Sequence, residues 1–159
     1  IYAIGDVEGQ SLLAHKAYRQ GEVAAEAVVG EPAAFDNQYI PSVIYTDPEI
    51  AVVGMVPEKA REEYEEVLVG RFPFSASWRA LTTKHDSGFT RVVASGEEEI
   101  LGVQIVGPRA SDMIAEATLA LEMGGYLDDI ANTIHAHPTF PEALKEAAAD
   151  AKDESVHTG

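Results

Sequence analysis

The chain has 159 residues, 46% of them hydrophobic, enough to bury the core of one domain with a further fragment. Its 27 acidic and 11 basic residues give a formal net charge of −16, which argues against nucleic acid and anionic membranes as partners. No apolar run reaches the roughly 18 residues of a membrane span. Since the sequence has no cysteine, a disulfide framework and a thiolate metal site are excluded within these residues.

The N-terminal 30 residues predict one strand and one helix. Residues 1–7 are apolar and β-prone up to a polar turn, which is typical of a strand. Residues 11–29 have helical spacing of Ala and Leu, with Ser11 as the expected N-cap and Gly30 as the C-terminal glycine. This unit has no sheet of its own to join, so we interpret it as part of a larger domain.

A linker at 31–41 leads into short β-prone runs. Strands are predicted at 42–46, 51–56, 66–74, 89–95 and 100–106. Pro57 suits the first position of a helix over 58–65, and Pro73 indicates an edge strand or the end of a strand. The last two runs flank a four-residue loop opened by Gly96, which predicts a hairpin.

Helices are predicted at 109–123, 127–134 and 140–151, the last with Thr139 as its N-cap. With four or five mainly antiparallel strands, these helices predict an α+β fold. The expected organisation is a strand–helix unit over 1–35, an α+β domain over 36–150 and a disordered acidic tail over 151–159.

The run HAHPTFPE carries the candidate chemistry. Pro138 favours an extended conformation at His137, and Glu142 has capping-box spacing from Thr139, which folds its carboxylate back over the helix start. A carboxylate has acceptor capacity for both the helix and an imidazole. If Glu142 accepts from one ring nitrogen of His137, the other nitrogen becomes a directed proton acceptor, suited to deprotonating a thiol.

Spacing alone leaves two interpretations of this run open, a plain helix cap and a site. His135 alternates with His137 along an extended segment, so the two are a poor metal pair and no metal site is expected. His85 and His157 are predicted to be ordinary surface residues.

Several motifs occur in an order that resembles the dihydrolipoamide dehydrogenases, a branch of the FAD-dependent pyridine nucleotide-disulfide oxidoreductases. These motifs are AIGDV, LLAHKA, PSVIYTDPEIAVVG, GRFPFSAS, GFTRVV, ILGVQIVGPRASDMIAEATLALEM and HAHPTFPE. The resemblance runs from Ile1 to about Ala149. It implies that residues 1–35 end an FAD-binding domain and that 36–150 form an interface domain through which two subunits pair. Trp78 departs from it, standing where relatives usually carry a small residue.

The resemblance also implies roles for individual residues. Asp6 would bind the ribityl chain of FAD, and the backbone of Leu13, Ala14 and His15 would lie near the flavin. The final motif makes His137 and Glu142 the acid–base pair that serves the partner subunit of a homodimer, with the His137–Pro138 bond cis.

The implied reaction oxidises dihydrolipoamide, free or on a lipoyl domain of a 2-oxo acid dehydrogenase complex, with NAD as acceptor and a cytoplasmic location. A glutathione reductase-like enzyme and a dimerisation module without chemistry are the alternatives. The acidity itself has two interpretations, a solvated surface that aids solubility and an adaptation to high salt, where screening removes the self-repulsion.

Overall fold

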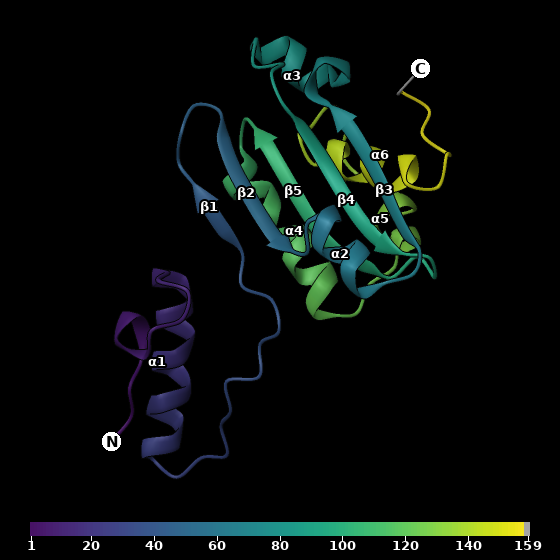
Figure 1. Cartoon of the computed structure of the whole chain (residues 1–159). Helices are drawn as coiled ribbons and strands as arrows, with labels where there is room; N and C mark the ends of the chain where they lie inside the picture. The colour runs from purple at the N-terminus through teal and green to yellow at the C-terminus, as the bar shows by residue number, and fades with distance from the viewer. Residues whose placement is uncertain (158–159) are drawn as a thin grey trace. The chain divides into compact units, whose positions relative to one another are not determined.

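The computed structural model describes residues 1–157 and divides the chain into two compact units, Ile1–Ile40 and the residues from Pro41 onward. Figure 1 traces both. The first unit contains the 3₁₀ helix η1 (Gly5–Glu8) and the helix α1 (Ala14–Val28). In residues 1–157 no helix is long and apolar enough to cross a membrane.

The first unit differs from the prediction at its start. Residues 1–4 lie outside any strand, and the strands of the described chain form the sheet of the second unit. Leu13, not Ser11, is the N-cap residue of α1, and Ser11 has a positive φ of 39°. The C-terminal end is as predicted, with Gly30 at φ 87° and the Glu31 amide donating to the carbonyl of Glu26.

The second unit is built on a five-stranded antiparallel sheet, in the order β1-β2-β5-β4-β3 within the described residues. The strands are β1 (Ser42–Ile44), β2 (Glu49–Gly54), β3 (Val67–Pro73), β4 (Phe89–Ser95) and β5 (Ile100–Gly107). The hairpin of β4 and β5 and the edge position of β3 are confirmed. The fold class is therefore α+β, as predicted.

Helices cover both faces of this sheet (Figure 1). They are α2 (Pro57–Glu63), α3 (Trp78–Thr83), α4 (Ala110–Glu122), α5 (Leu127–Ala131) and α6 (Glu142–Asp150). On one face α4 packs on β2 and β5 while α6 packs on β3 and β4. On the other, α2 contributes Ala60 to a cluster with Val93 and Leu101. The exposed edge of β3 is partly covered, because Asp150 accepts a hydrogen bond from the Arg71 amide at 2.8 Å.

The segment after α6, which we expected to be a disordered tail, has side-chain contacts in its described part. Residues 151–157 continue from α6 through turns, and the Lys152 ammonium forms ion pairs with Asp128 and, at 3.6 Å, with Glu98. Ser155 also donates to Glu146 at 3.2 Å. These contacts to neighbouring elements give the segment a defined path. Residues 158 and 159 lie outside the described part of the chain.

Candidate active site

The segment between α5 and α6 carries His137. Its backbone turns at the cis peptide bond between His137 and Pro138, as the resemblance implied. Thr139 Oγ1 donates to the carbonyl of Ala136 at 2.7 Å, which closes the turn. Phe140 packs edge-on against Phe74, with ring centroids 6.1 Å apart, and this anchors the segment to the second unit's core. The loop therefore holds His137 between two fixed points.

Glu142 divides its carboxylate between the histidine and the helix start. Its Oε1 lies 2.8 Å from Nδ1 of His137, and its Oε2 accepts from the Thr139 amide at 2.6 Å. The predicted capping box is only half correct, because Thr139 is not the N-cap residue and its hydroxyl bonds to Ala136 instead. Pro141, already helical in conformation, immediately precedes α6 and shifts the helix start to Glu142.

The resulting geometry suits His137 to proton transfer. Because a carboxylate only accepts hydrogen bonds, Nδ1 carries the proton, and Nε2 of the neutral ring is left as the basic nitrogen. Nε2 has no hydrogen-bond partner among residues 1–157. The His137 side chain is 63% exposed whereas that of Glu142 is 26% exposed, so the base faces outward and its orienting acid is partly covered.

His135 behaves differently. Its side chain is only 6% exposed, with Nε2 at 2.8 Å from Oε1 of Glu116 on α4 and Nδ1 at 2.9 Å from the carbonyl of Thr133. The hydrogen bond to Glu116 raises the pKa of His135, and burial opposes this only in part. No local motif indicated this pair, since its members are 19 residues apart.

A small hollow of about 50 Å³ lies beside the pair of His137 and Glu142. Trp78, Ser77 and His157 also line it. The helix that carries Trp78, α3, was absent from our prediction. Ser77 is its N-cap and accepts from the Ala80 amide at 3.4 Å, so a serine directly before a helix-forming run was the available signal. Trp78 is 63% exposed. His157 is exposed, as predicted, but pairs with Glu146 at 3.1 Å.

The proposed flavin-contacting residues lie together in the first unit. Asp6 is in η1, and Leu13, Ala14 and His15 form the N-terminal end of α1. Gln20 joins the two helices by accepting from the Gly5 amide at 2.8 Å, and Lys16 adds an ion pair to Glu8. This end of α1 has neither a side-chain cap nor an acidic residue in its first turn, so it suits an anionic or oxygen-rich group.

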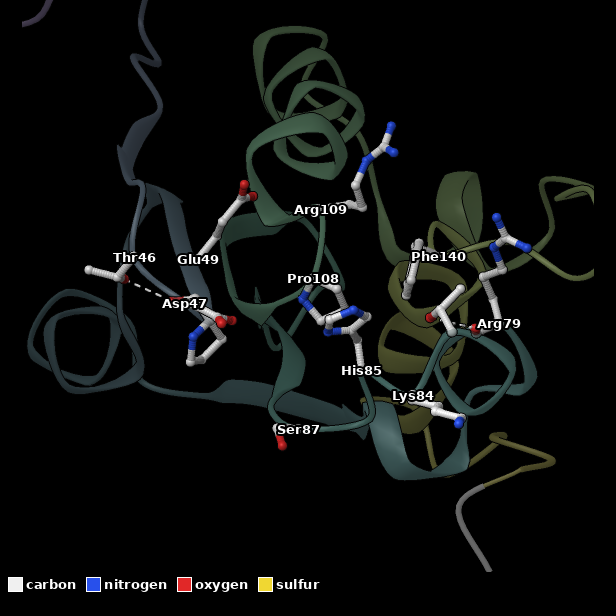
Figure 2. Close-up of a pocket in the computed structure, with 12 residues that line it drawn as sticks. Thr46, Asp47, Glu49, Arg79, Lys84, His85, Ser87, Pro108, Arg109 and Phe140 are labelled. Carbon is white, nitrogen blue, oxygen red and sulfur yellow. Dashed lines mark hydrogen bonds between the residues drawn. The ribbon is translucent and has the colours of Figure 1, made fainter.

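Another hollow lies elsewhere in the second unit, a groove of about 800 Å³ (Figure 2). Asp47 and Glu49 lie on one side of it, and Arg79 and Lys84 on the other. Phe140 borders it, but neither member of the His137 pair lines it. This groove and the candidate base are therefore separate features.

The chain belongs to the pyridine nucleotide-disulphide oxidoreductases, since residues 40–148 match the model of their dimerisation domain. It is 56% identical over 159 residues to dihydrolipoyl dehydrogenase 2 of Haloarcula marismortui, covering 99% of this chain and 34% of that protein. The dihydrolipoyl dehydrogenase of Thermus scotoductus is 52% identical over 158 residues, again covering 99% of this chain and 34% of that protein. The chain thus spans about a third of the length of the curated relatives that it matches.

Solved structures agree with the fold. LpdA of Mycobacterium tuberculosis has a TM-score of 0.84 at 26% identity, with 93% of this chain and 33% of that chain covered. The flavoprotein disulfide reductase RclA of Escherichia coli has a TM-score of 0.87 at 22% identity, covering 94% of this chain and 35% of that one. The resemblance drawn from the sequence motifs is confirmed at the level of the family.

Proposed function

We propose that the chain is the C-terminal part of an FAD-dependent dihydrolipoamide dehydrogenase that passes electrons to NAD. The observation that carries this is the hydrogen bond between His137 and Glu142, which leaves Nε2 of the histidine outward-facing and basic. The names of the relatives favour lipoamide over glutathione as the disulfide substrate, because they are dihydrolipoyl dehydrogenases at 48–56% identity among the first six.

In this proposal His137 is the catalytic base. Nε2 removes the proton from a thiol of dihydrolipoamide, whose ordinary pKa of about 8.5 keeps it mostly protonated at neutral pH. The thiolate is the nucleophile that attacks a disulfide, and that disulfide comes from residues outside this cysteine-free sequence. Glu142 stabilises the imidazolium that forms and keeps Nε2 aimed at the substrate.

FAD, when bound, supplies the electron path between the thiols and NAD. Asp6 and the N-terminal end of α1 at Leu13, Ala14 and His15 are the residues of this chain that we assign to it. The uncapped first turn of α1 supports this assignment, because backbone amides at a helix N-terminus stabilise negative charge.

The partners follow from the family. A second copy of the protein forms a homodimer through the dimerisation domain, and the His137 pair serves the partner's site. The substrate is dihydrolipoamide, which a lipoyl domain of a 2-oxo acid dehydrogenase complex can carry. We place the enzyme in the cytoplasm.

The test replaces His137 with glutamine in the full-length enzyme. Turnover of dihydrolipoamide should fall by about 10²–10⁴-fold, the usual scale for loss of a general base. His85→Gln is the matched control, since His85 is an exposed histidine apart from the pair, and it should leave turnover unchanged. A loss of less than threefold in His137→Gln would remove His137 from the mechanism. Turnover of glutathione alone would overturn the choice of substrate.

We further propose that the acidity of the chain is an adaptation to high salt. Relatives from Haloarcula marismortui and Halobacterium salinarum support this, together with the formal charge of −16. Salt at molar concentration screens the repulsion among the carboxylates. In dilute buffer this repulsion is not screened and destabilises the folded chain. Thermal unfolding should therefore occur at a lower temperature in dilute buffer than in molar salt, and equal stability in both would contradict the idea.

A further inference from the structure

His135 and His137 occupy the same loop but have opposite surroundings. His137 is exposed, whereas His135 is buried and has both ring nitrogens hydrogen-bonded. The partners of His135 are a backbone carbonyl, that of Thr133, and a carboxylate, that of Glu116. Both of these groups only accept hydrogen bonds, so the arrangement favours the doubly protonated ring, in which both nitrogens of His135 donate.

The pair of His135 and Glu116 ties the loop to a rigid element. Glu116 is on α4, which packs along β2 and β5 through buried residues such as Met113 and Ala117. Lys145 on α6 is the other charged group that acts on His135, and it opposes the protonated form. The loop is therefore attached to α4 two residues before His137.

Further hydrogen bonds continue this restraint to the candidate base. The Thr139 hydroxyl holds the carbonyl of Ala136, and Glu142 holds both the Thr139 amide and the His137 ring. Every residue from 135 to 139 thus belongs to, or is next to, a side-chain hydrogen bond. The position of Nε2 on His137 depends on this series.

The pair is only partly buried, since the His135 side chain is 6% exposed and the Glu116 side chain is 37% exposed. An ion pair that solvent reaches adds little to stability, so stabilisation alone accounts poorly for it. The hydrogen bond between His135 and Glu116 instead fixes the position of the loop that carries His137. A displacement of about 1 Å at a reacting group can cost about 10²-fold in rate.

We propose that His135, held by Glu116, is a positioning residue that sets where His137 presents Nε2 to the dithiol. The inference rests on the proposed function of His137 as the base. His135 touches no substrate in this arrangement, and it acts only through the loop that it anchors.

The experiment measures turnover in the full-length enzyme for His135→Gln, His137→Gln and the double variant. His135→Gln should lower kcat by roughly 10- to 100-fold while KM changes less than threefold, because the base is displaced but the substrate still binds. In the double variant the His135 change should cost less than a further twofold, since no base remains to position. His85→Gln is again the control.

Glu116→Gln is the conservative variant, because its amide oxygen still accepts from His135. Its kcat should lie between those of the wild type and His135→Gln, and it provides the test if His135→Gln fails to fold. NADH-dependent reduction of a dye, which needs no proton from a dithiol, should stay within twofold of the wild type in His135→Gln and Glu116→Gln.

The outcomes separate the two proposals. If His137→Gln keeps its turnover, the proposed function fails. If His137→Gln is inactive but His135→Gln and Glu116→Gln keep more than half of the wild-type kcat, only the positioning role fails. A loss from His135→Gln that is equally large with and without His137 also overturns it, because His135 would then act independently of the base.

Discussion

Both units of this chain are rich in apolar residues, but only one of them buries large apolar side chains. From Pro41 onward, large side chains such as Phe74, Ile105 and Leu144 are fully buried between a sheet and its helices. In Ile1–Ile40 the only buried residues are Gly5 and Lys16. Exposed apolar side chains in that unit include Ile1, Tyr2, Val7, Leu12, Tyr18, Val28 and Val29. An apolar pattern predicts an element, but burial needs a second surface to pack against.

The strongest test of this contrast separates the units. A polypeptide of residues 41–159 should unfold cooperatively on heating, because it contains the sheet and its core. A peptide of residues 1–40 should lose most of its helix, because a 15-residue helix is marginal in water and Gly21 weakens this one. Far-UV circular dichroism in the same salt measures both. A stable helix in the short peptide would remove the distinction.

A pair of glycine substitutions sharpens the contrast with a smaller effect. A Cβ at Gly70 would lie 2.0 Å from the carbonyl oxygen of Ala147 and 2.3 Å from the amide nitrogen of Ala151, both backbone atoms of α6 and its end. Gly70→Ala should therefore lower the free energy of unfolding by about 3 kcal/mol, the upper range for overpacking.

Gly21→Ala is the matched control in the first unit. Its Cβ would meet only Ile4 Cδ1 at 3.7 Å, an ordinary contact, and alanine favours the helix by about 1 kcal/mol. Denaturant unfolding monitored by circular dichroism measures both variants. Equal destabilisation by the two substitutions would show that close backbone packing does not distinguish the units.

The smallest expected effect is a difference in the response to pH. In the second unit, Glu116 raises the pKa of His135, so this contribution to stability is complete below the unfolded value of about 6.5 and is lost as pH rises through the folded pKa. In the first unit, the hydrogen bond from Lys16 lowers the pKa of Glu8, so its contribution is lost as pH falls through the folded pKa.

Melting temperatures of residues 41–159, measured from pH 5 to 9, test the contribution of His135 to stability. The Glu116→Gln variant should show a weaker fall in melting temperature with rising pH than the wild type, because the carboxylate that favours the imidazolium is gone. Identical slopes for the two proteins would contradict the assignment.

Local chemistry predicted those parts of the fold that depend on neighbours in sequence. Pro57 is the first residue of α2, Pro73 is on an edge strand, and Gly96 opens the hairpin loop. The hydrogen bond between His137 and Glu142 was also accessible, since its members are five residues apart. In each case the controlling interaction is complete within one turn or one loop.

Long-range packing decided what the sequence did not predict. The strand expected at residues 1–7 lacks a pairing partner, and the ion pair of His135 with Glu116 depends on how α4 crosses the sheet. The roles of the flavin-contacting residues stay predictions for a different reason. The FAD that they would contact is a separate molecule and not part of the chain.

The division of the Glu142 carboxylate between a ring and an amide restricts what evolution can place at this position. Aspartate is one methylene shorter, so it cannot span both partners from the same backbone site. Glutamine has the reach but offers one acceptor oxygen in place of two. Among the genetically encoded side chains, glutamate alone combines that length with two acceptor oxygens. Any substitution at position 142 therefore loses at least one of the two hydrogen bonds.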